Sequence, residues 1–93
     1  MTVGVCTIEL FLPDSRSLKD KRQILKSLKD RLRSRFNLSV AEVEDNDLWQ
    51  KAVIGIACVG NRRDHINEVL DKAIGTVRSI PEIQIVDYRL ELL

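Results

Sequence analysis

The spacing of apolar residues changes repeatedly along this 93-residue chain, and these changes constrain the fold more than any single motif does. From Val3 to Leu12 the side chains alternate between two sets, as expected of a β-strand whose successive residues point to opposite faces. From Ser17 to Phe36 the apolar residues instead recur every three or four positions, which is the spacing of one face of an α-helix. Ser17, followed three residues later by Asp20, resembles a capping box at the start of this helix, and Asn37 is expected to close it.

The middle of the chain has the features of a β-hairpin. Leu38–Val43 predicts a short strand, and a nearly continuous apolar run that begins at Lys51 or Ala52 and ends at Val59 predicts another. The acidic segment 44–47 between them favours a turn. We expect the second of these strands to be central in its sheet and covered on both faces. Trp49, at its entry, is expected to cover an edge of the core.

A second helix and a last strand complete the pattern. Asn61 is placed to cap a helix whose apolar residues recur from Ile66 to Val77, Pro81 stops that helix, and Ile83–Leu92 has the composition of a strand. With right-handed crossovers, the order strand, helix, strand, strand, helix, strand predicts a single ferredoxin-like α+β domain over residues 1–93. Its antiparallel four-stranded sheet would carry both helices on one face. This fold hosts many activities, so it predicts none by itself.

Composition and targeting features exclude several classes of protein. With 44% hydrophobic and 31% charged residues, the chain has the composition of neither a disordered nor a fibrous protein. Met1 leads directly into a strand pattern and no long uncharged segment follows, so we expect a soluble cytoplasmic protein. Cys6 and Cys58 lie in apolar runs without a Cys-x-x-Cys spacing, which predicts reduced core thiols rather than a metal site or a disulfide.

Positive charge is concentrated in the first helix. The segment 16–36 contains nine Lys or Arg residues and two acids, a balance of +7, whereas the rest of the chain holds six bases and twelve acids, a balance of −6. At about 100° per residue, five of these bases fall on one flank of the helix beside its apolar arc. We call them the basic stripe: Lys19, Arg22, Lys26, Lys29 and Arg33.

The basic stripe has two main interpretations. It fits a polyanion such as RNA or a ribosomal particle, whose phosphates attract cations without sequence readout, and no DNA sequence readout is expected. It also fits a solvated helix face that keeps a small protein soluble. An acidic protein partner is a third possibility, and a membrane surface is disfavoured because the apolar arc is needed for the core. Lys21 and Arg35, within or beside that arc, either extend to solvent or point into a cleft at the sheet margin.

The sequence contains no recognisable catalytic constellation. His65 is the only histidine, and no motif places a nucleophile beside it. The acidic residues of segment 42–47 lack the glycine and the spacing of a calcium loop. Arg62 and Arg63, before a helix N-terminus, are secondary candidates for holding a phosphate. We therefore expect a protein without catalytic residues, cofactor or metal.

The sheet face opposite the helices, which we call the open face, suggests a different contact. RNA-recognition domains of this topology stack bases on aromatic residues of their central strands, and 52–59 contains none. A homodimer interface is the better interpretation, built on Val5, Gly55, Ala57 and Val59. A competing hypothesis is a small-ligand or regulatory dimer with a pocket near Glu9, Asp87 and Arg89.

Three segments carry a family resemblance: SLKDKR at 17–22, LKDRLRSRFNLSVAEV at 28–43 and DLWQKA at 47–52. They resemble the YlxP-like family of small bacterial proteins, and the likeness covers nearly the whole chain. The resemblance implies a ferredoxin-like fold, a gene position among translation-initiation and ribosome-maturation genes, and no established activity or catalytic residues. Several matching positions are basic, and these are the residues that the family would use for contact: Lys19, Lys21, Arg22, Lys29, Arg31, Arg33 and Arg35.

Overall fold

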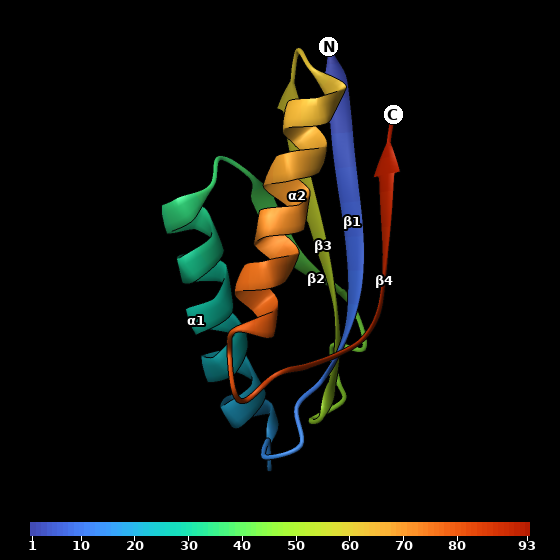
Figure 1. Cartoon of the computed structure of the whole chain (residues 1–93). Coiled ribbons are helices and arrows are strands. Elements are labelled where there is room, and N and C mark those ends of the chain that lie inside the picture. The colour runs from blue at the N-terminus through green and yellow to red at the C-terminus, as the bar shows by residue number, and fades with distance from the viewer.

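Figure 1 shows the computed structural model of the chain, in which all residues from 1 to 93 are described. The elements are β1 (Thr2–Phe11), α1 (Leu18–Arg35), β2 (Ser39–Glu44), β3 (Lys51–Gly60), α2 (Arg63–Arg78) and β4 (Gln84–Leu92). The strands form one sheet in the order β2-β3-β1-β4, in which every neighbouring pair is antiparallel. Both helices cover the same face of the sheet (Figure 1). The ferredoxin-like βαββαβ fold predicted from the spacing of apolar residues is confirmed.

The core lies between the helices and the sheet. It is formed by alternate residues of the strands, such as Ile8 and Ile54, and by the apolar arcs of the helices, such as Leu28 in α1 and Leu70 in α2. These four side chains are fully buried. The two central strands pair along their whole length, so the core has a continuous floor.

The open face corrects one expectation about β3. This strand is central, as predicted, but helices cover only one of its faces, and Val59 on the other face is 61% exposed. Its nearly continuous apolar run suggested two covered faces because small residues, Gly55 and Ala57, occupy open-face positions and count as apolar in the sequence. Only Val53 is buried on that side, between its neighbours.

The start of α1 follows the sequence closely. The Ser17 hydroxyl accepts a hydrogen bond from the Asp20 amide at 3.0 Å, as an N-cap side chain should. The Asp20 carboxylate accepts from the Arg16 amide at 3.0 Å, one residue before the position that a capping box would use. The helix ends at Phe36 as its C-cap, so the expected closure at Asn37 is one residue late.

The start of α2 differs from the prediction. Arg62, and not Asn61, occupies the N-cap position, and no side chain caps the helix. The Arg62 guanidinium instead pairs with Asp64, with its Nε 3.1 Å from Oδ1. The expectation for Asn61 was wrong because asparagine is generally preferred at the N-cap, whereas the backbone enters this helix one residue later.

No helix of the protein is long and apolar enough to span a membrane.

Both cysteines are free and buried, as expected, and Cys6 makes a testable contribution to stability. Burial, assisted by the Asp71 carboxylate, raises the pKa of the Cys6 thiol from 9.0 to about 11. The unfolded thiol therefore loses its proton first, and stability that is fully present below pH 9 should decline between pH 9 and 11. We expect the free energy of unfolding to fall over this interval by about 2 kcal/mol more in the wild type than in Cys6→Ala.

Urea unfolding of both proteins at pH 8 to about 11 measures this difference. The Cys6→Ala protein starts from a lower stability because of the lost side-chain volume, so the slopes, and not the absolute values, are compared. Parallel curves for the two proteins would contradict the assignment of the pH dependence to Cys6.

Candidate nucleic-acid interface

The basic stripe occupies the flank of α1 that borders the edge strand β2. The Arg33 guanidinium donates a hydrogen bond to the Val40 carbonyl of β2 at 3.2 Å, which fixes this flank beside the sheet edge. The opposite flank, with Ile24 and Arg31, lines a hollow with Ile80 and Glu82 from the connection after α2. The stripe therefore faces away from the second helix, and no other element covers it.

Most charges of the stripe have no carboxylate partner. Lys26 Nζ lies 3.2 Å from Asp30 Oδ2, and this pair is exposed, with 80% of the lysine side chain in solvent. An exposed pair of this kind contributes only about 0.3–0.5 kcal/mol. The remaining four residues, Lys19, Arg22, Lys29 and Arg33, form no ion pair. Lys29 is half-buried and the other four members of the stripe are exposed.

Lys21 has a different environment from its basic neighbours. Its side chain is 1% exposed, and its Nζ lies 2.7 Å from Glu42 Oε2, 2.7 Å from the Asp45 carbonyl and 3.0 Å from the Lys51 carbonyl. The three ammonium protons thus have three acceptors. Of the two placements considered from the sequence, the cleft at the sheet margin is the one observed for Lys21, whereas Arg35 is exposed.

Lys21 therefore joins α1 to the β2–β3 hairpin and is not available to a phosphate. Glu42 Oε2 is buried and makes no hydrogen bond with any other group, so the lysine is its one polar neighbour. This contact could not be predicted from the sequence, because its acceptors lie at least 21 residues further along the chain. The one indication of this contact in the sequence is that Lys21 falls within the apolar arc of the helix.

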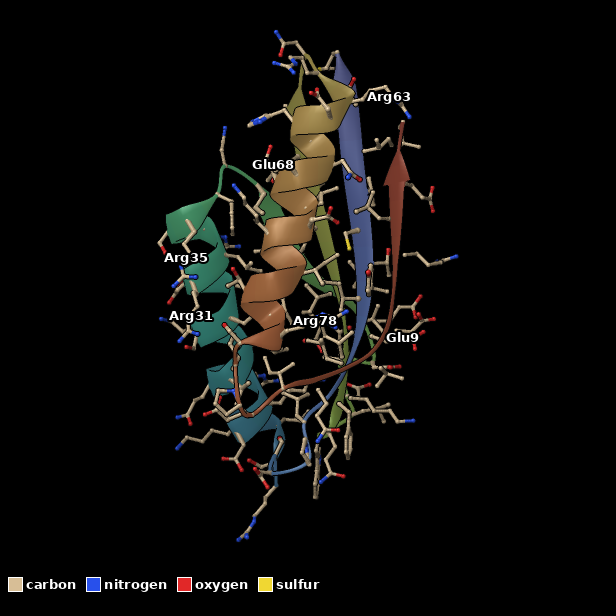
Figure 2. The ribbon with its side chains drawn as sticks, in the orientation of Figure 1. Glu9, Arg31, Arg35, Arg63, Glu68 and Arg78 are labelled. Carbon is tan, nitrogen blue, oxygen red and sulfur yellow. The ribbon has the colours of Figure 1, made fainter.

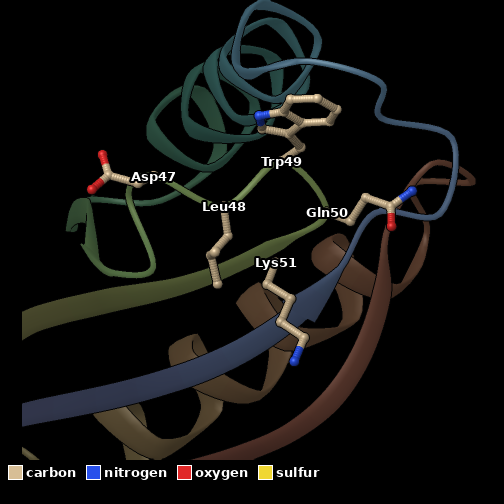
Figure 3. A pocket seen from close by; sticks show the side chains of 5 residues that line it. All are labelled: Asp47, Leu48, Trp49, Gln50 and Lys51. Atoms are coloured by element: carbon tan, nitrogen blue, oxygen red, sulfur yellow. The ribbon is translucent and has the colours of Figure 1, made fainter.

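The hairpin loop that Lys21 holds exposes the single tryptophan. Asp45 has a left-handed backbone with φ of 62°, and the Gln50 amide donates to the Pro13 carbonyl at 3.1 Å. Trp49 and Leu48 remain 57% and 45% exposed, beside a hollow of about 440 Å³ that Figure 3 shows from close by. The expectation that Trp49 covers an edge of the core was wrong, because backbone groups and Gln50 anchor the loop and leave the indole outside.

The secondary phosphate candidates are separated from the stripe. Arg63 lies at the start of α2, beside the chain's N-terminus, whereas α1, which carries Lys19 in its first turn, begins at the other end of the molecule (Figures 1 and 2). Arg62 is paired with Asp64, and its hydrogen bonds lower the pKa of that carboxyl. The structure therefore does not combine Arg62 and Arg63 with the basic stripe into one surface.

The remaining chemical candidates form no obvious reaction centre. His65 is exposed in the first turn of α2. No group of three or more His, Cys, Asp or Glu side chains is arranged to hold a metal ion. The residues named for a ligand pocket do come together, since Glu9 pairs with Asp87 and Thr7 with Arg89 across β1 and β4. The hollow between them is about 100 Å³, below the roughly 300–1,000 Å³ of most ligand sites.

The four residues named for a subunit interface share one part of the open face. Ala57 pairs with Val5, and Gly55 lies two residues before Ala57 on β3 and Val59 two residues after it. An apolar hollow of about 290 Å³ lies over Gly55, bordered by Val43 of β2 and Val5 of β1. The sequence did not reveal this hollow, because it depends on the register of β2 against β3.

Fold and surface together define a small ferredoxin-like α+β protein with a cationic helix flank. The family model described as "Protein of unknown function (DUF503)" matches residues 3–90, and the chain belongs to this family. It is 34% identical to the uncharacterized protein YlxP of Bacillus subtilis (strain 168) over 82 residues, which cover 88% of this chain and 89% of that protein. The resemblance seen in the sequence is confirmed.

One solved structure supports the fold. The de novo designed protein LFR1 1 with ferredoxin fold superposes with a TM-score of 0.53 at 9% identity, over 100% of this chain and 83% of the design. The designed protein Ferredog-Diesel has a TM-score of 0.47 at 14% identity, over 98% of this chain and 84% of that one. At such identities the similarity to LFR1 1 concerns the fold alone.

Proposed function

We propose that this protein is a non-enzymatic RNA-binding protein whose basic stripe contacts the phosphates of RNA, free or within a ribosomal particle. One observation carries the proposal: four of the five cations on this flank of α1 have no carboxylate partner, and no element of the fold covers them. Like charges at spacings of three and four residues repel, at a cost of a few tenths of a kcal/mol per pair. A polyanion along the flank offsets this repulsion.

The dimensions of the stripe fit an extended anionic partner. Lys19 and Arg33 are 14 residues apart on one helix, which is about 21 Å at 1.5 Å per residue. Within this length a cation recurs every three or four residues, or about every 5 Å. Phosphate contacts of this kind supply affinity and orientation, without information about sequence.

Binding of RNA through the open face would require aromatic residues on the central strands, on which bases could stack. On the open-face side of β1 and β3, Phe11 at the end of β1 is the one aromatic residue. Tyr88 of β4 is engaged by Arg78 of α2, whose guanidinium carbon lies 5.8 Å from the ring centre. Base stacking on the central strands is therefore unsupported, which favours the helix flank as the proposed RNA contact.

Salt dependence provides the test of the proposal. Five phosphate contacts predict a slope of about −3.5 to −4.5 when the logarithm of the binding constant is plotted against that of the salt concentration. Affinity for a labelled ribosomal RNA fragment, measured by fluorescence anisotropy, should fall by about 100- to 500-fold between 50 and 200 mM salt. Lys19→Gln with Arg22→Gln should reduce the slope by about two.

The matched control is Arg31→Gln with Arg35→Gln. These two exposed residues, labelled in Figure 2, belong to the same helix and to the basic positions shared with the family, but not to the stripe. The control removes the same charge and therefore tests the stripe against these other positions. The proposal expects the control to bind RNA with nearly the wild-type slope. Equal losses in both variants would indicate a general effect of net charge, and a flat, negligible affinity of the wild type would refute RNA binding.

A further inference from the structure

The open face carries a raised residue and a hollow at equal distances from Ala57. Val59 is 61% exposed and projects from β3 two residues after Ala57, or about 7 Å along the strand. Gly55 lies two residues before Ala57, and above it is the apolar hollow of about 290 Å³. Both residues are on the same face of the same strand, because side chains two positions apart share a face.

We propose that two copies of this chain pair through their open faces around a two-fold axis that crosses β3 at Ala57 and β1 at Val5. The axis lies between the two sheets, at right angles to the strands. A rotation about it places Val59 of each copy over the Gly55 hollow of the other, and Ala57 over its own counterpart. The small Ala57 side chains let the two sheets approach, so one surface is complementary to itself, as a two-fold interface requires.

The positions of the charges favour this direction of the axis. Three carboxylates, those of Glu9, Glu44 and Asp87, line one hollow at the end of the open face away from Val59, and Arg89 supplies the one positive charge there. None of them forms an ion pair within the chain. An axis parallel to the strands would hold the two sets of carboxylates at the same end of the dimer. The proposed axis carries them to opposite ends, so the two sets of like charges do not face each other.

The proposed axis also brings two like charges together, and this unfavourable contact provides a test that is specific to the axis. Glu91 pairs with Val5 and therefore lies on the axis row, at the β4 margin. Each Glu91 faces its own counterpart in the dimer, and like charges across an interface oppose association. Removing this charge should strengthen the dimer, an effect that a contact through any other face would not show.

The area of the open face predicts a reversible dimer. The axis at Ala57 lies close to the Gly60 end of β3, so the two sheets overlap over only about seven residues of each strand. Four strands at about 4.8 Å spacing and seven residues at about 3.3 Å give roughly 450 Å² per copy. This is less than the roughly 800 Å² per partner of a standard stable interface. Self-association should therefore depend on concentration and be visible only across a dilution series. The basic stripe lies in the other layer of the fold, so pairing leaves it accessible.

Sedimentation equilibrium over a wide range of concentrations tests the dimer. The wild type should pass from monomer to dimer, and Ala57→Glu, which places two carboxylates at the axis, should raise the dissociation constant at least tenfold. Val86→Glu is the matched control, since Val86 is 64% exposed on β4 but lies outside the proposed contact. It should leave the dissociation constant unchanged, whereas Glu91→Gln should lower it several-fold. Circular dichroism confirms that each variant is folded.

Cross-linking tests the axis itself. A cysteine at position 57 faces its own copy, so Ala57→Cys should be joined into covalent dimers by a short bifunctional maleimide. The wild type should give none, because Cys6 and Cys58 are buried. A wild type that stays monomeric at every concentration would refute the inference, as would a dimer in which Ala57→Cys is not joined. Neither result bears on RNA binding, which is measured separately through α1.

Discussion

Replacing Lys21 with methionine is expected to lower the free energy of unfolding by about 3–5 kcal/mol, the usual cost of removing one partner of a buried ion pair. Methionine keeps the unbranched, flexible form of the side chain but removes the ammonium group. Glu42 Oε2 then loses the one group that lies within bonding distance, and the carbonyls of Asp45 and Lys51 lose their donor. An uncompensated buried carboxylate, and not lost packing, is the main cause.

The measurement is chemical and thermal unfolding followed by the fluorescence of Trp49, the single tryptophan. A loss of this size should lower the melting temperature by more than about 10 °C, since 1 kcal/mol shifts a domain of this length by about 4–8 °C. Lys26→Met is the matched control on the same helix. Its ion pair with Asp30 is exposed, so the expected change is about 0.5 kcal/mol or less.

A double variant separates the charge from the packing. Lys21→Met combined with Glu42→Leu removes both charges and should recover much of the stability lost in Lys21→Met, because no carboxylate is then left unpaired. If Lys21→Met alone unfolds within 1 kcal/mol of the wild type, the buried pair does not hold the hairpin to α1. Trp49 fluorescence quenching in the same proteins reports whether the hairpin loop has loosened.

The parts of this structure that followed from the sequence are those set by local periodicity. Alternation in β1 and the three- or four-residue repeat in α1 depend on residues within one element, so the fold and the Ser17 cap could be predicted. The same holds for the positions of the basic stripe around α1. The strand that lies beside the basic stripe could not be predicted, because it depends on which sheet edge α1 covers.

Long-range contacts account for what the sequence did not show. Lys21 appeared as one more base near an apolar arc, and its acceptors became visible only when β2 and the hairpin loop were placed against α1. Trp49 was misplaced for the same reason, since a loop residue has no periodicity that assigns it to a side. The hollow at Gly55 is bordered by Val43, which lies at the bulge in β2 between Glu42 and Glu44, and no pattern of apolar residues marks this bulge.

Gly4 should be nearly as sensitive as Lys21, although a glycine in a strand is usually replaceable. A Cβ atom at this position would overlap Ile66 Cγ2 and lie 2.8 Å from Leu70 Cδ1, both on α2. The Ile66 methyl is attached at its branched Cβ and cannot turn aside without leaving its rotamer, so the helix itself must move from β1. We expect Gly4→Ala to cost about 1–3 kcal/mol in the free energy of unfolding, as overpacked cores do.

Gly75→Ala is the control for this effect, and it should change stability in the opposite direction. Gly75 lies within α2, and nothing is within 4 Å of the Cβ that alanine would add. Alanine should therefore stabilise the helix by about 0.5–1 kcal/mol, because it loses less backbone entropy on folding than glycine. Urea unfolding of the two variants beside the wild type measures both shifts. If both variants moved in the same direction, close contact between α2 and β1 would not be the reason for a glycine at position 4, since only that contact distinguishes the two sites.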